Sequence, residues 1–229
     1  MMKRFMAVAF CLCLALPLFA QDKETQRLKD AYNTLHDILG MPDKGIPRDL
    51  INKSECVIVV PSMKKAAFIV GASYGRGTML CRSGENFKGP WSAPAFYALE
   101  GGSFGFQAGG SSTDYVILVM NEKGARSVMT SKVKLGGDAS VAAGPVGRTT
   151  AAETDIVMNA EMLSWSRAKG VFAGVSLTGS TLRSDDDANK NLYGKDVDAK
   201  QIIEQNAVKA TAAGMPLVKL MNKISPKHL

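Results

Sequence analysis

The spacing of apolar residues predicts helices at the start of the chain, strands in its centre and helices toward its end. Between residues 22 and 40, apolar side chains recur every three or four positions, as they do on one face of an amphipathic helix. Gly40 and Pro42 end this pattern. A second short helix is expected over 47–53, where Pro47 suits a first-turn position. The apolar face of the first helix comprises Leu28, Ala31, Tyr32, Leu35, Ile38 and Leu39.

The centre of the chain carries short apolar runs and glycine-rich segments, both of which indicate strands. Pro61 is expected to stop the first strand, and Gly75-Arg76-Gly77 is expected to form a tight turn or bulge. The glycine-rich segment 101–110 is expected to pack closely on neighbouring backbone or to curve sharply. The predicted strands cover 56–60, 66–74, 78–82, 93–99, 101–110, 115–120, 132–135, 139–142, 156–165 and 171–182.

Helical spacing returns over 121–131, 185–193 and 198–206, and a mobile, basic tail is expected to follow as far as Leu229. The second of these helices opens with three consecutive acids from Asp185, which lack the ligand spacing of a calcium loop. Helix capping is therefore favoured over cation binding for these acids. We predict an α+β fold, in which helices at the N- and C-terminal ends flank a Gly-rich, mainly antiparallel sheet that could curve into a barrel.

Residues 1–20 have the pattern of a secretory signal peptide. Lys3 and Arg4 precede an apolar run over 5–19, and Ala20 is a small residue that suits cleavage. The run is short for a membrane span. We therefore expect the protein to be exported and to be periplasmic or envelope-associated after cleavage near Ala20.

The composition provides few residues for catalysis. The chain has two histidines, His36 and His228, and both lie outside the predicted sheet. No Ser-His-Asp set can be assembled around its serines, so we expect no catalytic residue, no cofactor and no enzymatic activity. The 28 Lys and Arg residues exceed the 21 Asp and Glu residues, which gives a net charge of +7. This dispersed excess fits either an ordinary solvated surface or attraction to anionic lipid head groups, and we expect no nucleic-acid partner.

Cys56 and Cys81 are the cysteines that would remain after cleavage. Each lies at the end of a predicted strand, and an isolated pair in an oxidising compartment is more often bridged than free. A disulfide closing this loop would stabilise the fold by roughly 3 kcal/mol. A metal site is not expected, since two cysteines without nearby histidine cannot complete a tetrahedral set.

Basic residues near the predicted turns form the candidate binding site. Lys132 and Lys134 share one face of a strand, so their electric fields add. Each basic residue alone fits a solvated surface charge, and the hypothesis is that they act together on lipid head groups. The candidates are Lys64, Lys65, Lys132, Lys134, Arg148, Arg167 and Lys169.

Two glycine-rich segments, 132–148 and 165–180, resemble the signature of the SYLF domain, a lipid-binding module. Further similar segments occur in the same order, and the resemblance covers about 47–194. These supporting segments are 61–71, 74–77, 91–94, 114–121 and 187–194. The resemblance implies a SYLF-like lipid-binding domain over 47–194, preceded by an N-terminal helical segment over 21–46 and followed by a C-terminal helix and basic tail over 195–229.

Eukaryotic SYLF proteins are associated with phosphoinositide binding, and some with actin. For an exported chain, the resemblance implies a non-enzymatic module of the cell envelope that binds anionic phospholipid or a membrane surface. Two alternatives stay open. The chain could be an envelope scaffold that binds a protein or glycan partner, or a hydrolase with an unrecognised site.

Overall fold

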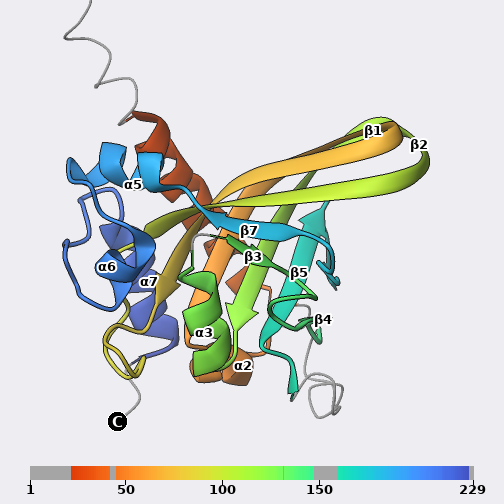
Figure 1. Cartoon of the computed structure of the whole chain (residues 1–229). Coiled ribbons are helices and arrows are strands. Elements are labelled where there is room, and N and C mark those ends of the chain that lie inside the picture. Colours follow the sequence, from red (N-terminus) through yellow and green to blue (C-terminus); the bar gives the residue numbers. More distant parts are fainter. Residues whose placement is uncertain (1–21, 42–44, 131, 147–158, 227–229) are drawn as a thin grey trace, which may run out of the picture.

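The structure is a computed structural model that describes residues 22–41, 45–130, 132–146 and 159–226. The expected signal peptide over 1–20 lies outside the described residues. The fold is α+β, as predicted, with a curled and mostly antiparallel sheet between helices from the two ends of the chain (Figure 1). Its described strands form one seven-stranded sheet.

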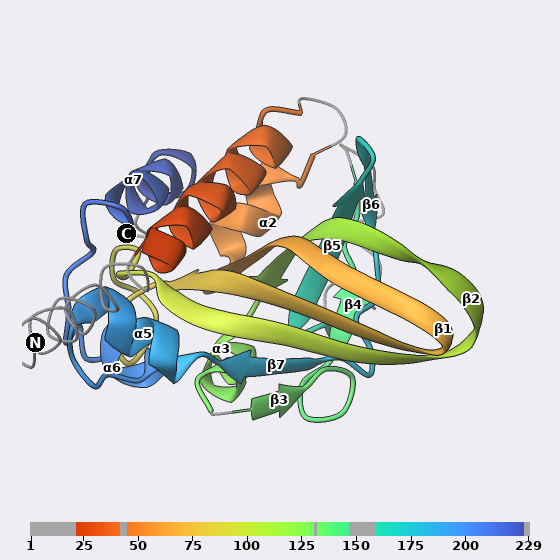
Figure 2. The ribbon, with the colours of Figure 1, turned by 90° about the horizontal axis from the view of Figure 1, so that it is seen from above.

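Two long strands, β1 (Cys56–Cys81) and β2 (Ala95–Val119), form the centre of the sheet. They pair antiparallel from Cys56 opposite Val119 to Met79 opposite Ala95. The ribbon made by these strands bends back near its middle, and this bend extends from the body as an arm (Figure 1, Figure 2). The bend brings the two ends of β1 together, where the expected disulfide joins Cys56 to Cys81.

The other strands extend the sheet from the two halves of β2. Strand β7 (Thr181–Ser184) pairs with the first half of β2, and β3 (Lys132–Lys134) pairs with β7. Strand β5 (Met162–Ala168) pairs with the second half of β2. Along its other side, β5 pairs with β4 (Val141–Ala143) in parallel and with β6 (Val171–Gly174) antiparallel.

The predicted strand ends at Pro61 and at Gly75-Arg76-Gly77 are wrong, because β1 runs through both segments. Pro61 lies where the register shifts between Val60 and Met63, so the shift accommodates a residue that cannot donate a backbone hydrogen bond. The two glycines serve close packing: a Cβ at Gly75 would lie 2.6 Å from Cγ1 of Val60. Glycine is thus required where β1 folds against itself.

The predicted strand over 171–182 is also wrong as one element, since it divides into β6 and β7. Backbone turns interrupt it at Gly179, which has a φ of +86°. The predicted strand over 156–165 begins outside the described residues, and only its part from 162 to 165 belongs to β5.

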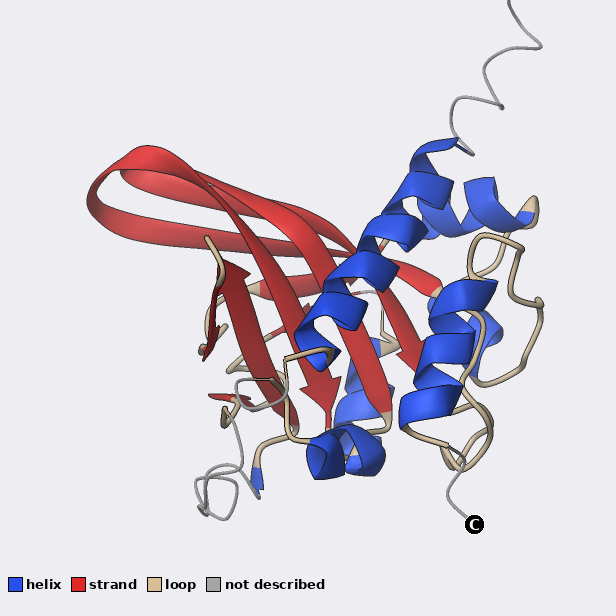
Figure 3. Ribbon diagram, turned by 180° about the vertical axis from the view of Figure 1, so that it is seen from behind, coloured by secondary structure: helices blue, strands red, loops and turns tan. Residues whose placement is uncertain are grey.

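Helices cover both faces of the sheet. One face packs against the N-terminal helix (residues 22–39), α2 (Arg48–Lys53) and α7 (Met215–Ile224). Figure 2 shows α7 beside the N-terminal helix, and Figure 3 shows the long N-terminal helix crossing this face. The opposite face packs against α3 (Glu122–Val128) and α6 (Ala199–Ile203).

A smaller cluster of buried residues joins the N-terminal helix to α5 (Asp186–Tyr193) through Leu28, Phe96 and Leu192.

Alternate residues of β1 pack on the two faces of the sheet: Ile58 lies in one core and Val59 in the other. All five predicted helices are present, and the two over 121–131 and 198–206 are shorter by several residues. The other three, over 22–40, 47–53 and 185–193, are each shorter by one residue.

The expected mobile tail after Asn206 is wrong, because it contains helix α7. Its apolar positions recur at helical spacing, and Leu217, Val218 and Met221 are buried against the core. Pro216 lies in the first turn, where the missing N–H has no intrahelical partner to lose. The basic residues of this segment therefore lie on an ordered helix.

The crossing of β1 over itself gives a test of the fold. A Cβ at Gly77 would lie 2.5 Å from the carbonyl oxygen of Val59, so Gly77→Ala is expected to destabilise the protein by about 1–3 kcal/mol. Gly102→Ala is the matched control, since a Cβ there meets no atom within 4 Å. Urea unfolding of both variants measures the difference. Equal stability of the two variants would contradict the close crossing.

Candidate functional site

The structure places the predicted basic residues in separate parts of the sheet. Lys64 and Lys65 lie on β1, and Arg167 and Lys169 lie in or after β5, so these four flank β2. Lys132 and Lys134 form the ends of β3, at the edge of the sheet beyond β7. Arg148 lies outside the described residues.

Several of these side chains form ion pairs or hydrogen bonds with other residues of the same chain. Arg167 forms ion pairs with Asp114 at 2.9 Å and with Asp37 at 3.1 Å. Lys64 donates a hydrogen bond from Nζ to Oγ of Ser112 at 3.0 Å. Lys132, Lys134 and Lys169 are exposed. Arg167 therefore links the N-terminal helix to the sheet, which gives it a structural role that the sequence did not indicate.

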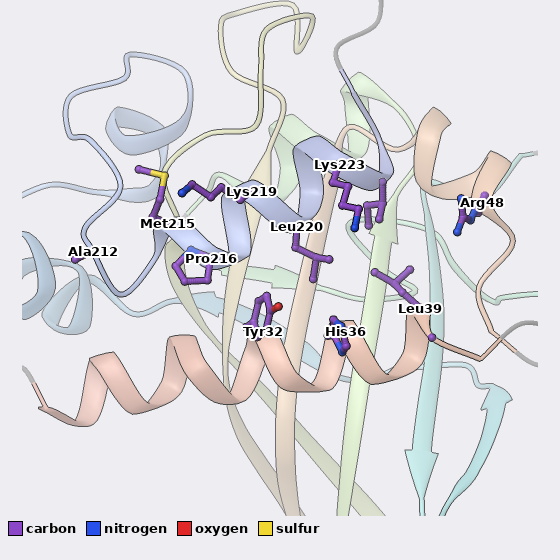
Figure 4. A pocket seen from close by; sticks show the side chains of 12 residues that line it. Tyr32, His36, Leu39, Arg48, Ala212, Met215, Pro216, Lys219, Leu220 and Lys223 are labelled. Atoms are coloured by element: carbon purple, nitrogen blue, oxygen red, sulfur yellow. The ribbon is translucent and has the colours of Figure 1, made fainter.

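A groove between the N-terminal helix and α7 gathers cationic and apolar side chains (Figure 4). Its volume is about 860 Å³, within the range of roughly 300–1,000 Å³ that is usual for small-molecule sites. Its lining residues include three cations and one histidine but no Asp or Glu. They are Tyr32, His36, Leu39, Gly40, Arg48, Ala212, Met215, Pro216, Lys219, Leu220, Lys223 and Ile224.

Amphipathic helices explain why these side chains face the groove. On the N-terminal helix, Leu35 and Ile38 are buried in the core, whereas Tyr32 and Leu39 are only partly covered. The apolar face of this helix is thus wider than the core beneath it. The rings of Tyr32 and His36, one turn apart, stack with centroids 5.7 Å apart.

Helix α7 supplies the opposite wall in the same way. Its buried residues fix its rotation, so that Lys219 and Lys223, four residues apart, lie on one exposed side. Arg48 comes from the first turn of α2 and is exposed. Ion pairs recorded among the described residues involve none of these three cations.

A buried arginine holds the C-terminal end of α7 in place. Arg82 is 0% exposed, and its Nη2 donates to the Ser225 carbonyl at 3.0 Å, the Ser225 hydroxyl at 2.8 Å and the Pro226 carbonyl at 2.8 Å. Its guanidinium lies 4.4 Å from the ring centroid of Trp91, whose Nε1 also donates to the Ser225 carbonyl. Burial lowers the pKa of Arg82, and the charge of Glu55 opposes this shift.

The start of the N-terminal helix is held by a cluster of four charged residues. Arg27 is 7% exposed and contacts Asp185 at 2.9 Å and Glu24 at 3.1 Å, while Arg76 contacts Asp185 at 3.0 Å. Burial raises the pKa of Glu24, with Arg27 opposing it. Burial also acts to raise the pKa of Asp185, but Arg27 and Arg76 outweigh burial and lower it.

The acidic run lies at the start of α5, as expected, with Asp185 at the N-cap position and Asp186 and Asp187 in the first turn. The side chain of Asp185, however, forms no capping hydrogen bond. Its carboxylate instead accepts hydrogen bonds from Arg27 and Arg76, which tie the N-terminal helix and β1 to α5. One wall of the groove is therefore fixed by ion pairs and the other by Arg82.

Sequence reasoning missed the three groove cations Arg48, Lys219 and Lys223. The available signal was the spacing of Lys219 and Lys223 by four residues within an apolar helical pattern that begins at Pro216. Arg48 carried no such signal, because only the contact of α2 with α7 brings it to the groove.

The described residues contain no group of three or more His, Cys, Asp and Glu side chains placed to hold a metal ion. Within the described part of the chain, no helix has both the length and the apolar character needed to cross a bilayer. The arrangement offers positive charge beside apolar surface, which is suited to binding an anion that carries an apolar group.

Comparison with known proteins identifies the family. The family Ysc84, described as "Las17-binding protein actin regulator", matches residues 100–224. An SH3 domain-containing protein of Schizosaccharomyces pombe is 35% identical over 181 residues, covering 77% of this chain and 41% of the relative. SH3 domain-containing YSC84-like protein 1 of Xenopus laevis is 30% identical over 213 residues, covering 92% of this chain and 62% of the relative.

Protein YSC84 of Saccharomyces cerevisiae is 28% identical over 207 residues, covering 89% of this chain and 43% of the relative. The chain thus spans 41 to 62% of the length of these relatives. The match to residues 100–224 covers more than half of the sequence, and the chain belongs to the Ysc84/SYLF-domain family.

Proposed function

We propose that this protein is a non-enzymatic lipid-binding module of the cell envelope that associates with anionic phospholipid. One observation carries the proposal: the groove between the N-terminal helix and α7 combines three cations with apolar side chains and has no carboxylate in its lining. Basic residues near an anionic membrane surface contribute about 1 kcal/mol each to binding. The resemblance to phosphoinositide-binding SYLF domains supports a ligand of this class.

The location in the envelope is part of the proposal. It rests on the signal-peptide pattern of residues 1–20, in which Lys3 and Arg4 precede an apolar run that ends near Ala20. The disulfide between Cys56 and Cys81 agrees with an oxidising compartment.

A protein partner is the alternative function. LAS seventeen-binding protein 3 of Saccharomyces cerevisiae is 29% identical to this chain over 189 residues, and its name states a protein ligand. By analogy, the chain would be an envelope scaffold for a protein or glycan. The carboxylate-free groove favours the lipid, because it matches an anionic amphiphile in both charge and polarity.

Vesicle flotation tests the lipid-binding function. The protein from residue 21 onward, which retains every described residue, is expected to float with phosphatidylglycerol-containing vesicles at low salt and to be released at high salt. Lys219→Glu/Lys223→Glu is expected to weaken vesicle binding by at least about 30-fold, because the loss of two cations alone accounts for this factor and the two new carboxylates add repulsion.

Lys132→Glu/Lys134→Glu is the matched control, because it changes the charge equally at the edge strand β3. A loss of flotation only in this control would move the site to the residues suggested by the sequence. An absence of flotation under all conditions would overturn the lipid-binding function and favour the scaffold.

A further inference from the structure

The groove is polarised along its length. Ala212, Met215 and Pro216 lie at the end formed by the start of α7, and Lys223 and Arg48 lie toward the other end (Figure 4). Lys219 lies one turn after Met215 on α7, and Figure 4 shows its side chain extending toward Met215. Two of the three cations, Lys223 and Arg48, thus lie away from the exposed Met215, as a ligand with an acyl chain and an acidic head requires.

The apolar end is open to a ligand. Met215 is 38% exposed, one of the few large hydrophobic residues that the described structure leaves so accessible. Tyr32 contributes an aromatic surface from the N-terminal helix, and Leu220 lies farther along α7. An acyl chain in this position would remove apolar surface from water on two helices at once.

The cationic end is held so that its charges stay together. The Ser225 hydroxyl, which accepts a hydrogen bond from Arg82, is 3.2 Å from the carbonyl oxygen of Ile51 in α2. The end of α7 that carries Lys223 is therefore tied to the helix that carries Arg48. Two cations from different helices are thus fixed on one side of a recess, where their fields add.

We propose that the groove binds one anionic, single-chain amphiphile as a separate molecule, with its acyl chain between the N-terminal helix and α7. Its acidic head group lies at Lys223 and Arg48. This inference rests on the proposed lipid-binding function and deepens it, since it commits the groove to a monomeric fatty acid or lysophospholipid. The recess, rather than a flat basic surface, is what distinguishes this mode of binding from adsorption to a membrane.

Isothermal titration with dodecanoate below its critical micelle concentration tests this proposal. Dodecanoate is expected to bind with one site per protein, whereas acetate, which has the same head group without the chain, is expected not to bind. Dodecanol, which has the chain without the charge, is expected to bind at least about tenfold more weakly than dodecanoate.

Two groove variants and two matched controls locate the site. Met215→Glu and Lys219→Glu/Lys223→Glu are each expected to weaken dodecanoate binding by at least about tenfold. Val171→Glu places the same charge at a residue of β6 that is 68% exposed, and it is expected to bind as the unmodified protein does. Lys132→Glu/Lys134→Glu is the charge-matched control on β3. Circular dichroism establishes that each variant is folded.

The outcomes separate this inference from the proposed function. Flotation with anionic vesicles but no binding of monomeric dodecanoate would overturn the single-amphiphile groove and leave the lipid-binding function standing. Binding of dodecanoate that both groove variants leave unchanged would also overturn the assignment of this groove. Dodecanoate binding without flotation would support the groove and contradict membrane docking, whereas the absence of both would overturn both proposals.

Discussion

Replacing Arg82 with Ala is expected to lower the free energy of unfolding by about 3–5 kcal/mol, because it removes a buried group that ties three acceptors together. The guanidinium holds the Ser225 carbonyl, the Ser225 hydroxyl and the Pro226 carbonyl at the end of α7. Truncation would leave the buried Ser225 groups with fewer donors and would leave a void beside the Trp91 ring. Urea unfolding measures the loss.

Arg183→Ala is the matched control for this prediction. Arg183 lies in β7, is 41% exposed and pairs with Glu100 at the surface, so its removal is expected to cost about 1 kcal/mol or less. Hydrogen exchange of the α7 amides should accelerate in Arg82→Ala and remain unchanged in Arg183→Ala. Similar losses of stability in both variants would show that Arg82 does not anchor α7.

The anchoring of α7 also concerns the groove. If Arg82 fixes the helix that carries Lys219 and Lys223, its replacement should weaken vesicle binding even though Arg82 does not line the groove. Arg82 thus acts as a positioning residue. The variant Arg82→Lys keeps the positive charge but lacks the planar guanidinium and its fixed donors. Flotation of this folded variant therefore distinguishes the effect of positioning α7 from the effect of the charge itself.

Local signals in the sequence predict the helices and the disulfide. The N-terminal helix repeats its apolar residues over many turns, and such a long periodic segment is the most reliable signal that a sequence offers. Cys56 begins one apolar run and Cys81 ends another, and the bending of β1 brings these two residues together.

Contacts between distant segments explain what the sequence could not show. Gly75 and Gly77 indicate a turn when β1 is considered alone, and only the crossing over Val59 and Val60 shows that they permit close packing. Arg167 appears in the sequence as a free surface cation. In the structure it forms an ion pair with Asp37, which is 130 residues away in the chain. The groove also depends on contacts between distant segments, because its cations come from separate helices.

Asp185→Ala is expected to lower the free energy of unfolding by about 3 kcal/mol, near the lower end of the cost of breaking a buried ion pair. Arg27 is 7% exposed and would lose its contact with Asp185, although Glu24 would remain 3.1 Å away. Asp187→Ala is the matched control from the same acidic run, since Asp187 is exposed. The triple variant Glu24→Gln/Arg27→Met/Asp185→Asn should recover much of the loss, because it removes together the buried charges that pair with one another.

The pH dependence of this loss identifies its cause. The pKa of Asp185 is lowered from its usual value of 3.8, because Arg27 and Arg76 outweigh the effect of burial. Asp185 therefore stabilises the fold fully above about pH 3.8 and loses this effect as the pH falls through its lowered pKa. The contribution of Glu24 to the pH dependence of stability has the opposite sign, because burial raises its pKa. Glu24 is present in both proteins that are compared. The difference in unfolding free energy between the unmodified protein and Asp185→Ala should thus shrink below pH 3.8, and a difference that stays constant into acid would mean that lost packing, rather than the ion pair, is responsible.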